Sequence, residues 1–112
     1  MAENKFADVS TEFAIQILKL TDRIKGHYSL SNQLERSGTS IGANIREAKY
    51  AHSRPDFIAK LQIALKECSE SEYWLELLIE SGYFEDKTVL DQCIEIKKLL
   101  IASINTAKGN QK

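Results

Sequence analysis

The long stretch after Ser53 constrains the fold most, because it contains a single proline, Pro55, and no glycine before Gly82. Ser53 is a preferred N-cap residue, and Asp56 stands three positions later, where an acidic side chain can complete a reciprocal cap. Pro55 occupies the first turn, where a missing backbone N–H costs nothing, and Gly82 supplies a stop signal. The stretch therefore predicts one long helix over about residues 54–82.

Within this helix, apolar and small residues recur at alternating steps of four and three, the spacing that places side chains along one face. This core stripe consists of Phe57, Leu61, Ala64, Cys68, Ser71, Leu75, Leu78 and Gly82. A second apolar row, Ile63, Trp74 and Leu77, points to roughly the opposite side. A helix with two apolar faces must be covered twice, so we expect a neighbouring subunit to cover Ile63, Trp74 and Leu77.

The same spacing predicts three further helices, at about residues 4–25, 29–51 and 86–108. Gly26 follows the first helix, and Asp86 is a plausible cap for the last. No run of alternating apolar and polar residues indicates a strand.

Gly38 and Gly42 interrupt the second predicted helix, and each glycine costs about 1 kcal/mol relative to alanine in a helix interior. A flexible linker is the alternative for this segment. We favour a helix because the apolar spacing continues to Ile45 and Ala48 without a break in phase. Glycines one turn apart would also let another helix approach closely.

All predicted connections are short, and short connections make successive helices antiparallel neighbours. The expected fold is therefore all-α, an antiparallel up-and-down four-helix bundle formed by residues 1–112 as a single domain. No apolar run approaches the roughly 20 residues that span a bilayer, and the first residues are polar rather than signal-like. We expect a cytoplasmic protein without a membrane partner.

Side chains that could carry chemistry are few: two histidines and two cysteines in 112 residues. No spacing of a nucleophile and a base, and no Glu-x-x-His pair, indicates a catalytic or metal site. We therefore expect no enzyme activity, no cofactor and no small-molecule substrate. Cys68 and Cys93 fall on apolar stripes and are interpreted as reduced core thiols. A small thiol- or metal-dependent enzyme using Cys68 with Glu72, four residues apart on one helix face, is the less favoured alternative.

Glu72 interrupts an otherwise apolar row of the third helix, formed by Ile58, Leu65 and Ile79. An unpaired buried carboxylate is costly, so Glu72 requires a partner. Asn44 flanks the apolar face of the second helix in a similar way. We predict that Asn44 and Glu72 form a buried polar layer that sets the register of the helices.

Basic residues cluster at the junction of the second and third helices, at Arg46, Lys49, His52 and Arg54. Such a patch can contact the phosphates of RNA. Dipole compensation at helix C-termini is the simpler explanation for the same cations. The chain has 15 Lys and Arg against 16 Asp and Glu, a net charge of −1, which argues against wholesale coating of nucleic acid but permits a local patch.

Several short motifs occur together in the middle of the chain. They are Arg36-Ser37-Gly38-Thr39-Ser40-Ile41, Ala43-Asn44-Ile45 with Glu47-Ala48, Ser53-Arg54 with Asp56-Phe57-Ile58, Lys66-Glu67, and Glu72-Tyr73-Trp74-Leu75. As a set they resemble the 23S ribosomal RNA intervening-sequence protein family, a family of four-helix-bundle proteins. The resemblance implies a homopentameric ring, and for relatives that accompany diversity-generating retroelements it implies binding of RNA and of a reverse transcriptase. Relatives often carry proline where this chain has Gly42.

The sequence thus favours a non-catalytic, oligomeric scaffold associated with RNA or with a nucleic-acid-processing protein. The alternative is a protein–protein interaction scaffold that binds no nucleic acid. Its partner would dock on the acidic residues of the third helix, Glu67, Glu70, Glu72, Glu76 and Glu80.

Overall fold

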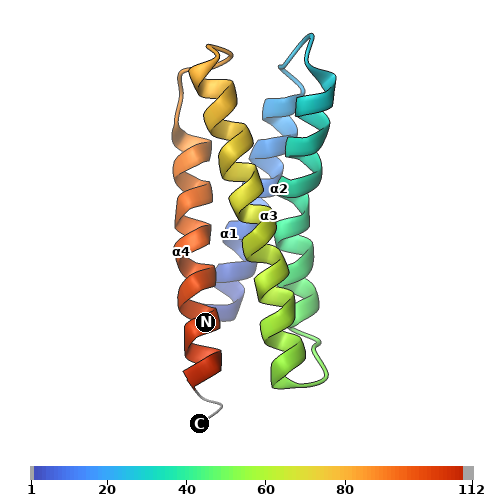
Figure 1. Ribbon diagram of the computed structural model, residues 1–112, viewed down its shortest axis with the longest axis vertical. Coiled ribbons are helices and arrows are strands. Elements are labelled where there is room, and N and C mark those ends of the chain that lie inside the picture. Colours follow the sequence, from blue (N-terminus) through green and yellow to red (C-terminus); the bar gives the residue numbers. More distant parts are fainter. Residues whose placement is uncertain (1, 110–112) are drawn as a thin grey trace.

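The protein forms four antiparallel helices in a computed structural model that describes residues 2–109 (Figure 1). The helices are α1 (Ala2–Thr21), α2 (Tyr28–Ala48), α3 (Arg54–Glu80) and α4 (Thr88–Gly109). Each helix packs against its neighbours in the chain, and α4 packs back on α1. No strand occurs within residues 2–109, so the prediction of an all-α up-and-down bundle is confirmed.

Helix α3 begins and ends at the predicted signals. The Ser53 side chain accepts a hydrogen bond from the Asp56 backbone N–H at 3.2 Å, and Pro55 lies in the first turn. At the other end Gly82 adopts φ 85°, and the Tyr83 N–H donates to the Leu78 carbonyl at 3.0 Å. This left-handed glycine closes the helix by satisfying carbonyls of its last turn.

Three other helix ends differ from the prediction by a few residues. Helix α1 ends at Thr21 rather than Lys25, because the chain tightens there into turns closed by an Arg23 N–H to Leu20 carbonyl bond of 3.0 Å and similar bonds. Helix α2 likewise ends at Ala48, and i to i+3 bonds carry the chain on to Ala51. Helix α4 begins at Thr88, whose backbone N–H donates to Asp86 at 2.9 Å.

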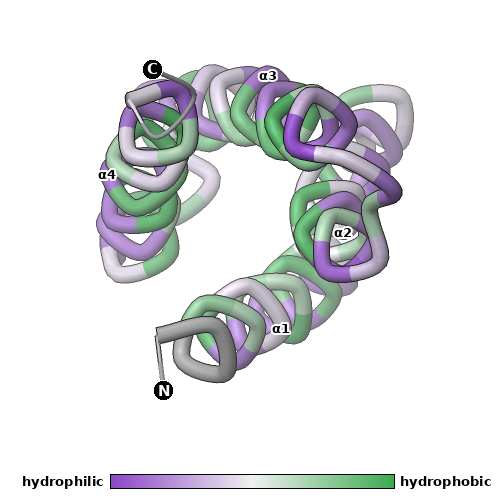
Figure 2. The backbone as a smooth tube through the Cα atoms, turned by 90° about the horizontal axis from the view of Figure 1, so that it is seen from below, coloured by the Kyte–Doolittle hydropathy of each residue, from purple (hydrophilic) through white to green (hydrophobic). Residues whose placement is uncertain are grey.

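The core stripe of α3 lies against the other helices as predicted. Six of its members are buried: Leu61, Ala64, Cys68, Ser71, Leu75 and Leu78. Phe57 is half-buried and packs against this core, while Gly82 is exposed in the turn. Viewed along the bundle, the apolar residues lie mainly on the inner sides of the four helices (Figure 2).

The small residues of α2 allow close packing against α1. A Cβ added to Gly38 would lie 3.0 Å from Cγ1 of Ile17, closer than side-chain contacts normally come. A Cβ added to Gly42 would lie 3.4 Å from Oγ of Ser10, an ordinary contact distance. Helix α2 runs through both glycines, so the predicted helix is confirmed. Of the two glycines, Gly38 lies where α1 and α2 approach each other more closely.

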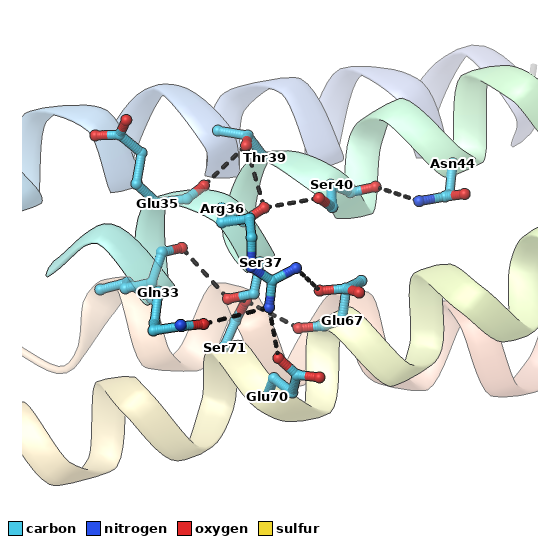
Figure 3. A network of polar contacts seen from close by, with 11 residues as sticks. Gln33, Glu35, Arg36, Ser37, Thr39, Ser40, Asn44, Glu67, Glu70 and Ser71 are labelled. Atoms are coloured by element: carbon cyan, nitrogen blue, oxygen red, sulfur yellow. Dashed lines mark hydrogen bonds and ion pairs between the residues drawn. The ribbon is translucent and has the colours of Figure 1, made fainter. Parts of the chain in front are cut away.

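Polar contacts join α2 to α3 around the middle of the bundle (Figure 3). Arg36 on α2 pairs with Glu67 at 3.3 Å and with Glu70 at 3.0 Å. Beneath the ion pairs of Arg36, Ser37 and Ser71 share a fully buried hydrogen bond of 2.8 Å. The two layers hold α2 and α3 in one register.

Candidate nucleic-acid interface

The four predicted RNA-contact residues lie together at one end of the bundle, around the α2–α3 connection (Figure 1). Arg46 belongs to the last turn of α2, Lys49 follows that helix, and Arg54 is the first residue of α3. His52 lies between them in the connection, and all four residues are exposed. The chain therefore presents a compact basic surface, here called the end patch: Arg46, Lys49, His52 and Arg54.

The carboxylates nearest the end patch in sequence have other partners. Glu47 accepts a 3.0 Å ion pair from Lys60, and the pKa of Lys60 is raised by that hydrogen bond. Asp56 accepts a hydrogen bond from the His52 backbone N–H at 3.2 Å. Within residues 6–109, whose side chains the structure describes, Arg46 and Lys49 form no ion pair. Their charges remain available to an anionic ligand.

Arg54 extends the end patch toward α4. Its guanidinium donates to the backbone carbonyl of Ala107 at 3.3 Å, in the last turn of that helix. Lys108, the next residue, is exposed and adds a cation to the same end of the molecule. The sequence pattern around the α2–α3 connection does not include Lys108, because only the up-and-down order of the helices places the C-terminus of α4 beside the N-terminus of α3.

The remaining basic group lies at the other end of a molecule whose longest dimension is 49 Å. Arg23, Lys25 and His27 belong to the α1–α2 connection, and the His27 ring packs edge-on against Tyr83 with 5.1 Å between centroids. The two basic groups therefore form separate surfaces.

The acidic residues of α3 do not form one free surface. Arg36 pairs with both Glu67 and Glu70, as Figure 3 shows, and Lys97 pairs with Glu72 at 2.7 Å. Glu76 and Glu80 are exposed and form no ion pair within the described side chains. Three of the five carboxylates therefore have a cationic partner within the subunit, and docking of a protein on this face stays a prediction.

The predicted layer of Asn44 and Glu72 is not formed. Asn44 donates to the carbonyl of Ser40 in its own helix at 2.9 Å, and both residues are half-buried. Glu72 faces α4 and pairs with Lys97, because its position beside the core stripe points away from α2. The hydroxyl groups of Ser37 and Ser71 do form a buried polar contact between α2 and α3. The sequence signal for this contact is a serine among the core-facing residues of α2 and another on the core stripe of α3.

The three residues proposed for the oligomer face differ in exposure. Ile63 is 43% exposed, whereas Trp74 and Leu77 are half-buried. The Trp74 ring packs against the hydrophobic core, and its buried Nε1 finds no hydrogen-bond partner within the described residues. A single subunit thus covers much of Trp74, which leaves only part of its ring for a neighbouring subunit to cover.

Cys68 and Cys93 are buried core thiols as predicted, but they also face each other across α3 and α4 with 3.7 Å between their sulfur atoms. This proximity could not be predicted from the sequence, because the two cysteines lie on different helices. Cys68 therefore contacts a second thiol rather than the Glu72 carboxylate, which Lys97 engages. In the part of the chain that the structure describes, no group of three or more metal-ligating side chains comes together.

The fold and its surface define a four-helix-bundle protein whose most distinctive site is a basic patch at one end. Among residues 2–109, none of the helices is both long and apolar enough to traverse a lipid bilayer. The chain belongs to the 23S rRNA-intervening sequence protein family, whose model matches residues 2–102.

One solved structure shows how closely the bundle is shared. A protein of unknown function from the S23 ribosomal protein family of Bacteroides thetaiotaomicron VPI-5482 is 49% identical to this chain, with a TM-score of 0.87. The match covers 94% of this chain and 99% of the Bacteroides chain. No curated protein matches the sequence.

Proposed function

We propose that the protein is a non-catalytic, homopentameric scaffold that binds structured RNA through the end patch. The observation that carries this proposal is the gathering of exposed basic side chains at one connection. Arg46, Lys49, His52 and Arg54 all lie at or beside the α2–α3 connection, and Arg46 and Lys49 form no ion pair among the described side chains. Exposed cations of this kind exchange counterions for phosphates on binding nucleic acid.

The family description names an intervening sequence of 23S rRNA, and this association is our reason to test RNA first among anionic ligands. Dipole compensation explains part of the patch, since Arg54 bonds a carbonyl at the C-terminus of α4. It does not require Lys49 and His52, which lie beyond the last turn of α2, to gather beside Arg54.

Assembly would turn a weak patch into a useful one. A few phosphate contacts on one subunit give low affinity, but a closed ring repeats them on a common rigid surface. Binding by several such sites should tolerate changes of RNA sequence and depend strongly on salt.

A binding titration with structured RNA at low and near-physiological salt tests the proposal. The variant Arg46→Ala/Lys49→Ala/Arg54→Ala should bind more weakly, with a shallower salt dependence, by about 0.7 to 0.9 in log–log slope for each lost phosphate contact. The matched control is Lys19→Ala/Lys66→Ala/Lys98→Ala, which removes the same charge from exposed positions elsewhere on the bundle. Circular dichroism verifies that each variant folds.

An equal loss of RNA affinity in both triple variants would mean that binding depends only on the net charge of the protein. That result would contradict the end patch as the RNA-binding site. No binding by the unchanged protein at low salt would contradict RNA as the ligand. In that case a protein ligand would be the remaining interpretation of the scaffold.

A further inference from the structure

The two cysteines form an isolated dithiol between α3 and α4. Their sulfur atoms lie 3.7 Å apart, and both residues are fully buried. Each sulfur atom also lies near the backbone carbonyl of the other cysteine, Cys68 Sγ at 3.3 Å from the Cys93 oxygen and Cys93 Sγ at 3.4 Å from the Cys68 oxygen. These reciprocal contacts show that the two residues stand directly opposite each other. A disulfide has its sulfurs about 2.05 Å apart, so the two sulfur atoms must move closer together for a bond to form.

An ion pair covers this dithiol. Glu72 and Lys97 each follow one of the cysteines by four residues, which is about 6 Å along a helix axis. Because α3 and α4 are antiparallel, the two residues lie on opposite sides of the cysteines along the bundle. Their side chains lean toward the N-terminus of their own helix and therefore toward each other, and they meet at 2.7 Å across the cysteine pair.

The cover is made of side chains rather than backbone. The side chains of Lys97 and Glu72 are 32% and 18% exposed, so both reach solvent. Partly exposed ion pairs of this kind are weak, with a typical stabilisation of 0 to about 1 kcal/mol. Movement of these two side chains is the route by which we expect a small oxidant to reach the sulfur atoms.

We propose that Cys68 and Cys93 form a reversible disulfide site that a peroxide oxidises and that locks α3 to α4. In the first step the Cys68 thiolate attacks one peroxide oxygen, the O–O bond breaks, and the departing oxygen takes up the proton that Cys68 released. In the second step the Cys93 sulfur attacks the resulting sulfenic acid, and hydroxide leaves as water with the Cys93 proton. Two thiols and one peroxide thus become one disulfide, one alcohol or water, and one further water.

The surroundings of the two thiols are nearly symmetric. The hydrogen bond between them lowers the pKa of Cys68 and raises that of Cys93, whereas burial and Glu72 raise the pKa of both and Lys97 lowers the pKa of both. We assign Cys68 as the attacking thiolate and Cys93 as the thiol that resolves the sulfenic acid, and the single-cysteine variants below decide between this order and its reverse.

The experiment treats the reduced, full-length protein with hydrogen peroxide under native conditions and then counts free thiols by alkylation in denaturant. Intact-mass analysis should find a disulfide within one chain, and dithiothreitol should restore both thiols. Thiols that remain free, or disulfides that join only different chains, would overturn the proposal.

Two pairs of variants test the roles and the cover. With Cys93→Ala, a dimedone-type probe should label a sulfenic acid at Cys68, and Cys68→Ala should leave Cys93 unlabelled. Lys97→Met should change the rate of disulfide formation, upward where access to the thiols dominates and downward where loss of the ammonium that lowers the pKa of Cys68 dominates, whereas Lys98→Met, at an exposed neighbouring position, should leave the rate unchanged. Equal labelling of both single-cysteine variants would contradict the assigned roles, and an unchanged rate in Lys97→Met would contradict the cover.

Discussion

Ser37 and Ser71 share a hydrogen bond of 2.8 Å between α2 and α3, and neither residue is exposed to solvent. Each hydroxyl also lies near a carbonyl of its own helix, Ser37 at 3.3 Å from Leu34 and Ser71 at 3.0 Å from Glu67. Since each serine has one proton, one hydroxyl can donate across the interface while the other donates to its own backbone. The pair thus places a fully satisfied polar contact inside the core and resists sliding of the two helices.

A double-mutant cycle should measure this contact. Each of Ser37→Ala and Ser71→Ala should lower the free energy of unfolding by about 1 kcal/mol, because the surviving serine keeps a backbone acceptor. The double variant should lose less than the sum of the single losses, since the two side chains touch. Urea unfolding followed by circular dichroism gives all three values, and strict additivity would contradict a direct interaction.

Alanine at the two glycines of α2 should have opposite effects. Gly38→Ala should destabilise the protein, because the new methyl group would lie 3.0 Å from Cγ1 and 3.1 Å from Cγ2 of Ile17. Gly42→Ala meets its neighbour at 3.4 Å, so the gain in helix propensity, up to about 1 kcal/mol, should prevail. Thermal unfolding of the two variants side by side checks the prediction. A stabilised Gly38→Ala would show that α1 is free to move away.

The helices and their buried faces could be predicted from the sequence because local signals and global packing agree. Ser53 and Gly82 mark the ends of α3, and the four-and-three spacing marks the residues that reach the core. Ends without such a signal were less predictable. Helix α1 ends at Thr21, where the hydroxyl bonds the Leu18 carbonyl at 3.2 Å and Glu35 of the next helix at 3.4 Å.

Pairing between helices was the part that the sequence could not supply. The place of Glu72 beside the core stripe indicated that its carboxylate needs a partner. Whether that partner is Asn44 on α2 or Lys97 on α4 depends on how α3 is rotated about its own axis in the bundle. The same limit hid the contact between Cys68 and Cys93. The end patch was predictable because its members adjoin one connection, whereas Lys108 joins it only through the topology of the bundle.

Removal of the Ser53 cap should destabilise α3. Ser53→Ala loses the acceptor of the Asp56 N–H and should cost about 1 kcal/mol. Ser69→Ala, on an exposed position in the middle of the same helix, is the matched control and should be neutral or slightly stabilising. Chemical unfolding distinguishes the two variants, and equal stabilities would show that the bond at Ser53 contributes nothing.

Stability at alkaline pH should depend on Lys97. Hydrogen bonding to Glu72 raises the pKa of Lys97, against an opposing effect of burial. A raised folded-state pKa means that this stabilisation is complete below the unfolded value of about 10.4 and is lost as the pH rises through the folded value. The difference in unfolding free energy between the unchanged protein and Lys97→Met should therefore shrink between about pH 10 and pH 12. A difference that stays constant over this range would contradict the ion pair.

Assembly through α3 can be tested at Ile63. Because Trp74 packs against the core of its own subunit, Trp74→Glu would disturb folding as well as any interface. Ile63 is 43% exposed, so Ile63→Glu should leave the fold intact and disrupt a neighbouring contact. Ile101→Glu on α4 is the matched control, because Ile101 is also 43% exposed.

Light scattering at micromolar concentration should give five times the 12.7 kDa chain mass for the unchanged protein and for Ile101→Glu, and a lower mass for Ile63→Glu. A charge placed in a closed ring interface would stay desolvated and unpaired, which is the physical reason to expect dissociation. A monomer mass for the unchanged protein would contradict assembly altogether. Dissociation by Ile101→Glu but not by Ile63→Glu would move the interface from α3 to α4, and with it the orientation in which a ring presents its end patches to RNA.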